Sequence, residues 1–241
     1  MKARTISGFI IAYLIITMAG CDYCFLNESI YGDGNVVSVK RKVPGFDGIR
    51  VSTGIDVFIK QGASEALKLE ADENLHEVIK TEVRNGTLNI YSEVNIRRAK
   101  SKKVYVIYKD LNRLRISSAG DITGVNTLKT DELEISLSSA GDLDLDVEAR
   151  EIDISISSSG DARITGSADY LKADLSSAGD LNAFDLKTRK CRINVSSAGN
   201  AKINVSEELN ATASSAGDIY YKGNPEYKNL NSSSAGGIHR Y

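Results

Sequence analysis

Tryptophan is absent from this 241-residue chain, and histidine, cysteine and net charge are all scarce. The two histidines, His76 and His239, lie outside the regular repeats described below. No spacing typical of a zinc site, a phosphate-binding loop or a nucleophile elbow occurs. The net charge is -2, with 30 basic and 32 acidic residues, so we expect no nucleic-acid partner. The 11 tyrosines and 5 phenylalanines are scattered and predict no stacking platform.

Long apolar runs are also lacking, except for one at the start of the chain. Residues 6–18 are apolar, follow Lys2 and Arg4, and end just before Ala19-Gly20-Cys21. A membrane span needs about 20 apolar residues, so this run is too short to be one. A charged start, a short apolar run and small residues before a cysteine resemble a bacterial lipoprotein signal, with an ordinary cleaved signal peptide as the alternative.

The lipoprotein resemblance implies a division of the N-terminal part of the chain. Residues 1–20 would be the signal peptide, and Cys21 would be the lipidated first residue of the mature protein. Residues 21–42 would then be a tether between the lipid anchor and the folded domain, 43–241. This predicts a protein held at the cell envelope by a lipid anchor in the outer membrane.

The remaining cysteines, Cys24 and Cys191, show no spacing that implies a disulfide. Cys191 falls in an apolar column of the repeats, beside Leu133, Ile152 and Leu171. We expect Cys191 to be a core residue that behaves as a small hydrophobe.

One pentapeptide, Ser-Ser-Ala-Gly-Asp, is abundant in the chain and occurs seven times with small variations. The intervals between its glycines are 21, 19, 19, 20, 18 and 19 residues. A fixed period near twenty residues is typical of a solenoid, in which each unit buries its apolar face against its neighbours. The glycines are Gly120, Gly141, Gly160, Gly179, Gly199, Gly217 and Gly236.

Each unit alternates apolar and polar residues on both sides of its glycine. The sixth and fourth residues before the glycine and the second after it are mainly apolar, as in Ile135, Leu137 and Leu143. Period-two alternation predicts strands with one buried face. Each unit is therefore expected to be a strand, a tight turn, a second strand and a variable return loop. We predict an all-β, right-handed, single-stranded parallel β-helix with about 19 residues per coil.

A leucine-rich solenoid is the competing architecture at this period, but it requires an asparagine ladder that these units lack. Residues 46–62 resemble a degenerate first coil with Gly54 at its turn. Between that coil and Gly120, the pair Asn85-Gly86 predicts a β-hairpin. We expect this section to be a cap region that covers the N-terminal end of the rod. Residues 237–241 end the last unit without a cap, which leaves pairing with another copy open.

The repeated aspartate admits two interpretations. A structural one has each carboxylate bond the N–H groups of its own turn, because aspartate and asparagine both do so. A functional one has the stacked carboxylates bind calcium, with Asp142, Asp144 and Asp161 as ligands. We favour the structural ladder and expect no cofactor or metal. The ladder consists of the first six turn glycines and the residues that follow them: Asp121, Asp142, Asp161, Asp180, Asn200 and Asp218.

Three segments together resemble the bacterial family described as putative auto-transporter adhesin, head GIN domain. They are FDGIRVSTGIDVFIKQG, LEADENLHEVIKTEVRNGTLNIY and the SSAGD units, over roughly residues 43–225. The resemblance implies a right-handed parallel β-helix in an envelope protein of the kind common in Bacteroidota. It transfers no catalytic or binding residue.

Three functions therefore stay open. The first is a non-enzymatic adhesin-like module that binds a protein partner or a glycan at the cell surface. The second is a carbohydrate-active enzyme, a polysaccharide lyase or hydrolase, with Asp142, Asp144 and Asp161 in a cleft. The third is a structural envelope protein that assembles through its last residues. The short regular coils lack the long inserted loops that would wall a catalytic groove, so we favour the first.

Overall fold

The computed structural model of the protein describes residues 28–241. The predicted signal peptide, 1–20, and the predicted lipidation site, Cys21, lie outside the described residues. The described chain is all β apart from one turn of 3-10 helix, η1 (Glu73–Leu75).

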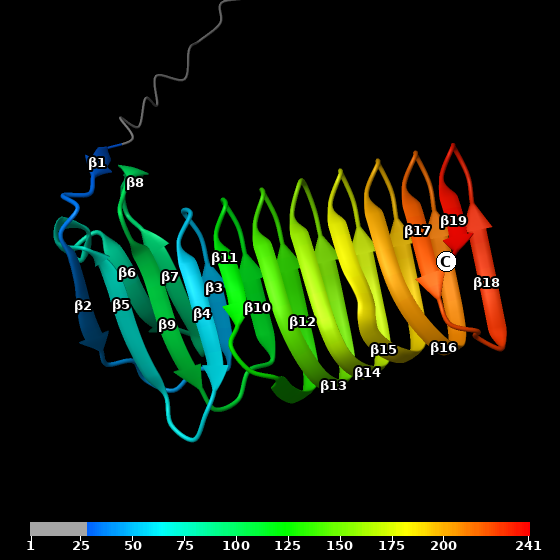
Figure 1. The fold of residues 1–241 in the computed structure, drawn as a ribbon, viewed down its shortest axis with the longest axis horizontal. Helices are drawn as coiled ribbons and strands as arrows, with labels where there is room; N and C mark the ends of the chain where they lie inside the picture. The colour runs from blue at the N-terminus through cyan, green and yellow to red at the C-terminus, as the bar shows by residue number, and fades with distance from the viewer. Residues whose placement is uncertain (1–27) are drawn as a thin grey trace, which may run out of the picture.

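Apart from the β1–β8 pair, the strands of the described chain form one sheet that is wound into a single rod (Figure 1). Their bounds are β1 Ser29–Tyr31, β2 Val36–Arg41, β3 Gly48–Val51, β4 Asp56–Gln61, β5 Ala66–Asp72, β6 Ile79–Arg84, β7 Thr87–Ser92, β8 Asn95–Arg98, β9 Lys102–Tyr108, β10 Arg113–Ile116, β11 Asp121–Gly124, β12 Leu128–Leu137, β13 Asp142–Ile156, β14 Asp161–Leu175, β15 Asp180–Val195, β16 Asn200–Ala213, β17 Asp218–Lys222, β18 Tyr227–Ser232 and β19 Gly237–Arg240.

Successive coils pair in parallel with the register that the repeats predict. Leu114 pairs with Ile135, which pairs with Ile154, and the same column continues through every later coil to Leu230. The first predicted coil also joins the stack, because β3 pairs with β10 and β4 pairs with β11. The parallel β-solenoid prediction is therefore confirmed, and the leucine-rich alternative is wrong.

Each coil has two faces joined by a sharp corner on one side and a smooth bend on the other (Figure 1). The predicted variable return loop is wrong for the middle of the rod. There the strand after one corner runs without a break around the bend into the strand before the next corner, as in the 15-residue β13 and β14. The bend keeps its parallel backbone pairing, so no separate loop is needed.

The N-terminal end of the rod is covered, as predicted. β6 and β7 form the antiparallel hairpin at Asn85-Gly86, and β7 pairs with β3 of the first coil. On the other face, β9 pairs with β4, β5 pairs with β9, and β2 pairs with β5. These added strands supply partners for the edges of the first coil, which would otherwise be exposed.

The prediction of a tether over residues 21–42 is wrong for its described part. β1 pairs with β8, and β2 pairs along its whole length with β5. Arg41 of β2 donates hydrogen bonds to the carbonyl groups of Ile79 and His76, which ties the strand to the cap.

One continuous apolar core runs through the rod from Phe46 to Tyr221. Cys191 lies in it, 1% exposed and free of any disulfide, as the apolar column predicts. At the other end the last coil is open: Leu230 is 41% exposed, although its partners in the same column are buried. No helix within residues 28–241 is long and apolar enough to cross a membrane.

Candidate functional site

In six of the seven repeated corners the turn has four residues, and its two central residues have left-handed backbones; in the corner that ends at Gly160 only Ser158 does. In Ser117-Ser118-Ala119-Gly120, φ is 53° at Ser118 and 57° at Ala119, and the Gly120 N–H bonds the Ser117 carbonyl at 3.2 Å. This is the pattern of a type I′ turn. The serine two residues before the glycine, Ser118 in this corner, is exposed to solvent.

The glycine of the corner is required by close packing and not by its φ. A Cβ atom on Gly141 or Gly179 would lie 2.6 Å from a methyl carbon of an isoleucine in an earlier coil. Across the seven corners the nearest atom to such a Cβ lies between 2.6 and 3.2 Å away. Only glycine lets the coils stack this closely at the corner.

Stacked corners also bond to one another. The Ala119 N–H donates to the Ser139 carbonyl at 3.0 Å, and Ala178 and Ala198 make the same bond to the corner that follows each. A left-handed backbone costs a non-glycine residue about 1–2 kcal/mol. The bonds between corners offset part of that cost in the stack.

The first coil repeats this corner with a shift of one residue from the predicted alignment. Its left-handed pair is Thr53 and Gly54, so the buried Ile55 takes the place of the corner glycine. Asp56 then pairs with Asp121. The aspartate column thus begins one coil earlier than the sequence pattern predicted.

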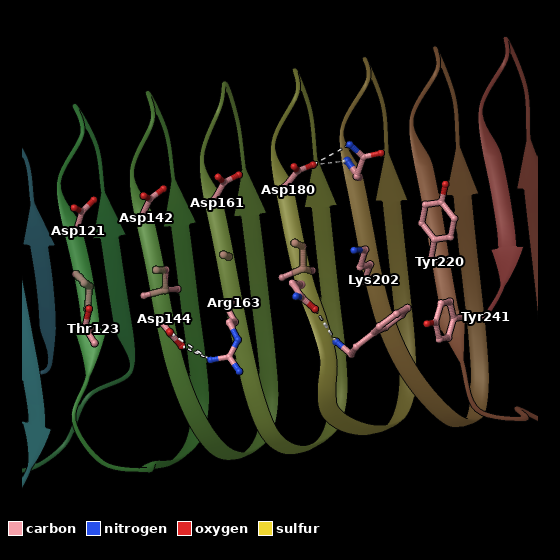
Figure 2. A pocket seen from close by; sticks show the side chains of 17 residues that line it. Asp121, Thr123, Asp142, Asp144, Asp161, Arg163, Asp180, Lys202, Tyr220 and Tyr241 are labelled. Carbon is pink, nitrogen blue, oxygen red and sulfur yellow. Dashed lines mark hydrogen bonds and ion pairs between the residues drawn. The ribbon is translucent and has the colours of Figure 1, made fainter.

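The column of carboxylates is formed as predicted, on the outward side of the strand that follows each corner (Figure 2). Asp121, Asp142, Asp161 and Asp180 are consecutive partners in the parallel register. Paired residues of adjacent strands are about 4.8 Å apart, so like charges repel along the column. Partial burial first, and then the neighbouring carboxylates, raise the pKa of Asp121 and of Asp161 above the ordinary value of 3.8.

The carboxylates do not bond their own turns, so the structural interpretation is wrong in that detail. Asp180 instead accepts hydrogen bonds from the backbone N–H of Asn200, at 3.2 Å, and from its side-chain amide, at 3.0 Å. Both donors belong to the next coil. The single asparagine in the column therefore relieves repulsion by supplying a donor where another carboxylate would repel.

A second row of side chains lies two residues beyond the column on the same face, and in it Asp144 pairs with Arg163 at 3.2 Å. Two residues further along the strand, Asp146 accepts hydrogen bonds from Thr127 and Thr165. Asp142 and Asp144 do lie on one outward strand, as the calcium hypothesis required. Within residues 28–241, however, no group of three or more acidic, histidine or cysteine side chains is arranged to hold a metal ion.

The two rows line a long, shallow groove of about 1090 Å³ that spans β11 and β13 to β17 (Figure 2). We call this surface the acid face. Its carboxylates are Asp121, Asp142, Asp144, Asp161 and Asp180; its basic groups are Arg163 and Lys202; its amides are Asn182 and Asn200; and its rings include Phe184, Tyr220 and Tyr241.

At its C-terminal end the acid face carries a cluster of aromatic rings, which we call the ring shelf. The shelf consists of Phe184, Tyr220, His239 and Tyr241. Tyr220 stacks on His239 with 5.1 Å between ring centroids, and Phe184 lies 5.1 Å from Tyr241. Tyr241 is 83% exposed. The sequence alone did not reveal this grouping of rings at one end of the rod.

The ring shelf was missed because its members are scattered along the sequence. Counted from the corner glycines, however, they share two offsets: Tyr220 and His239 stand three residues after a glycine, and Phe184 and Tyr241 stand five after one. Both offsets are odd and therefore outward on this strand. A search of the outward columns, rather than of the buried ones, would have found the shelf.

The outward surface of the strands before each corner, which we call the paired face, has a different chemistry. Here opposite charges from neighbouring coils meet: Lys172 lies 2.8 Å from Asp153, and Arg115 lies 3.3 Å from Glu134. The Lys172 pKa is raised by its hydrogen bond to Asp153. Charged side chains on this face therefore pair with one another.

Comparisons with solved structures give the same fold. A putative adhesin from Bacteroides fragilis NCTC 9343 matches with a TM-score of 0.82 and 22% identity, over 88% of this chain and 100% of that one. A putative lipid binding protein from Parabacteroides distasonis ATCC 8503 matches with a TM-score of 0.69 and 23% identity, over 89% and 100%. A putative adhesin from Parabacteroides merdae ATCC 43184 has 20% identity and a TM-score of 0.66, over 88% and 99%.

No curated protein matches the chain. At the sequence level, a family model covers residues 45–225, which is most of the solenoid with its N-terminal cap. The resemblance carried by the first coil, the hairpin segment and the SSAGD units is thereby confirmed. The chain belongs to the family of the putative auto-transporter adhesin, head GIN domain.

Proposed function

We propose that this protein is a non-enzymatic, adhesin-like binding module of the bacterial cell envelope, and that the acid face binds its partner. The partner is a protein or a glycan at the cell surface. The single observation that carries the proposal is the groove of about 1090 Å³ on one face of an otherwise regular rod. Concave surfaces with aromatic side chains and a few polar groups are where proteins bind ligands.

The arrangement of the carboxylates supports a binding role over a catalytic one. Glycoside hydrolysis uses two carboxyl groups that flank the bond to be broken. Asp142 and Asp161 are instead neighbours in a single column on one sheet face, so both approach a ligand from the same side. Asp144, the third residue of the enzyme hypothesis, is held by Arg163.

The experiment that tests this role measures binding of residues 28–241 to a panel of immobilised glycans and matrix proteins. This segment contains the continuous core from Phe46 to Tyr221. A Thr123→Arg, Asn182→Arg double variant places two bulky side chains in the groove. We expect it to weaken binding at least tenfold.

The matched control is a Ser136→Arg, Ser155→Arg double variant, which adds the same two side chains to the paired face. We expect it to bind like the parent. Equal binding by the parent and both variants would show that the ligand does not use the acid face, and the proposal would fail.

The envelope location rests on the lipoprotein-like start of the chain. We propose that Cys21 is lipidated and holds the rod at the outer membrane. Cells that express the full chain and are fed an alkyne-bearing fatty acid should label the parent and not a Cys21→Ser variant. Label on both forms would contradict this anchor.

A second candidate role, self-assembly, is favoured by the open last coil. Tyr227 is 71% exposed and Leu230 is 41% exposed on β18, whose outer edge has no partner strand within the described chain. Pairing of two such edges would bury both side chains. Sedimentation should then show a dimer that a Leu230→Asp variant dissociates; a monomeric parent at high concentration would exclude the role.

A further inference from the structure

We propose that the ring shelf is a carbohydrate subsite, and that it takes an uncharged or amino-substituted sugar unit of a glycan chain lying in the groove. This inference rests on the proposed function and names the ligand class of the same face.

The geometry of the shelf fits a sugar ring. Tyr220 and Tyr241 lie at the same end of the groove (Figure 2). Phe184, from an earlier coil, also lines the groove and lies beside Tyr241. Tyr241 leaves 83% of its surface open, while Tyr220 is half-buried and backed by His239. Rings of this kind offer large, rigid apolar surface with a polar tip. The C–H faces of a pyranose pack against such surfaces.

Hydrogen-bonding groups for hydroxyls flank the rings. Asp180 and Asn200 lie on the corner side of the shelf, and Asn182 and Lys202 lie in the second row beside it. Within residues 28–241 the Lys202 ammonium makes no ion pair or hydrogen bond, so it is available as a donor. Carboxylates and amides accept from several hydroxyls at once, which is the requirement of a polyol ligand.

The charge of the groove sets which glycans fit. Five aspartates line it against Arg163 and Lys202, and Arg163 is already paired with Asp144. A polymer that carries carboxylates or sulfates would meet uncompensated negative charge along the whole column. An uncharged glycan avoids this repulsion, and an amino-substituted one relieves it.

Aromatic rings on this protein already accept ammonium groups, which supports the amino-substituted case. Lys222 lies over Phe184, with 5.2 Å from its Nζ to the ring centroid. At the other end of the rod Lys68 lies over Tyr105 at 4.0 Å. Cations over ring faces are attracted by the ring electrons. A basic peptide shares this attraction, but it makes no use of the flat ring faces beside a row of hydroxyl acceptors.

The test is calorimetric titration of residues 28–241 with four probes. They are an uncharged β-glucan hexamer, a chitosan hexamer, a polygalacturonate fragment and a decapeptide of alternating lysine and serine. We expect binding of the first or second and at least tenfold weaker binding of the third and fourth. A Tyr220→Ala, Tyr241→Ala double variant should lose at least tenfold in affinity for the glycan.

The matched control is Tyr170→Ala, which removes a half-buried tyrosine of the paired face and should bind within twofold of the parent. Circular dichroism checks that each variant keeps its β structure. Preference for the acidic polymer or the peptide, binding of no probe, or unchanged affinity in the double tyrosine variant would overturn the inference. If glycan binding falls in the Thr123→Arg, Asn182→Arg variant but not in the tyrosine variant, the groove stands as the binding surface and the ring-shelf subsite fails.

Discussion

The two outward faces of the rod are built by the same repeat, yet they handle charge in opposite ways. On the paired face the register brings Asp153 beside Lys172, with 2.8 Å between carboxylate and ammonium. On the acid face the same register stacks Asp142 on Asp161 and Asp161 on Asp180. Both faces share one backbone, one strand spacing and one set of corners.

The fold does not by itself require the aspartate column. The chain can place opposite charges in register one face away, so a β-solenoid of this period does not force like charges together. Partial burial first, and then repulsion between neighbouring carboxylates, raise the pKa of Asp121 and Asp161, which means that these charged groups cost stability at neutral pH. A costly feature that lines a groove is better explained by binding than by folding.

The largest effect is expected at the corner that holds the two faces in register. A Cβ on Gly179 would lie 2.6 Å from the Ile156 Cγ2 atom. Gly179→Ala should lower the free energy of unfolding by about 1–3 kcal/mol, the usual range for overpacking. Chemical denaturation measures it. Gly45→Ala is the control, because its Cβ would meet only one atom, at 4.0 Å, and an equal loss there would contradict the packing argument.

A carboxylate in the N-terminal cap, Asp72, differs from those of the column because hydrogen-bond donors surround it. Asp72 is fully buried, and burial by itself raises its pKa, but N–H groups of Lys100, Ser101 and Gly34 donate to it and the net pKa lies below 3.8. Asp72→Asn should lower the free energy of unfolding at pH 7 by about 1–3 kcal/mol.

The pH dependence of Asp72 follows from the sign of its shift. A depressed folded-state pKa stabilises the protein above the ordinary value of 3.8, and this contribution is lost as the pH falls through the folded-state pKa. The stability gap between the parent and Asp72→Asn should therefore close in acid. A gap that is constant from pH 7 to pH 2 would show that the charge of Asp72 is not what stabilises the cap.

The same substitution on the two faces should have opposite signs. Asp161→Asn removes a repelled charge and should raise the free energy of unfolding at pH 7 by a few tenths of a kcal/mol, roughly the scale of exposed charge pairs. Asp153→Asn removes the partner of Lys172 and should lower it by a similar amount. Because the Asp161 pKa is raised, the advantage of Asp161→Asn should vanish as the pH falls below that pKa and the parent carboxyl is protonated. Two changes of the same sign would contradict the comparison.

The smallest expected effect is that of calcium. A calcium ion takes six to eight oxygen ligands, whereas a straight column presents its carboxylates side by side along one line. Millimolar calcium should leave the thermal midpoint of residues 28–241 unchanged. A rise that an Asp142→Asn, Asp161→Asn double variant loses would instead establish the column as a metal site.

The sequence predicted the buried half of this structure well. Period-two alternation and constant spacing between glycines predicted the strands, the register and the place of Cys191 in the core. These features are local or strictly repeated, and burial of apolar side chains enforces them in every coil. The hairpin at Asn85-Gly86 was equally clear, because few residues accept that turn.

The outward half was predicted less well. In the first coil Ile55 stands at the position that a glycine takes in the later corners. Which residue fits at this position depends on the strands that pack beside the coil. The tether prediction failed at β2 because that strand is held by pairing with β5. No local pattern in the sequence of β2 indicates this pairing.

By itself the sequence determined the coil, its period and the direction in which the side chains of the regular repeats point, since alternation and repetition act within one unit. Only the tertiary structure decided which outward side chains meet. Phe184 and Tyr241, 57 positions apart, come together because coils stack about 4.8 Å apart. Contacts between coils depend on register across several units, and solvent-facing positions carry no burial pattern from which that register could be read.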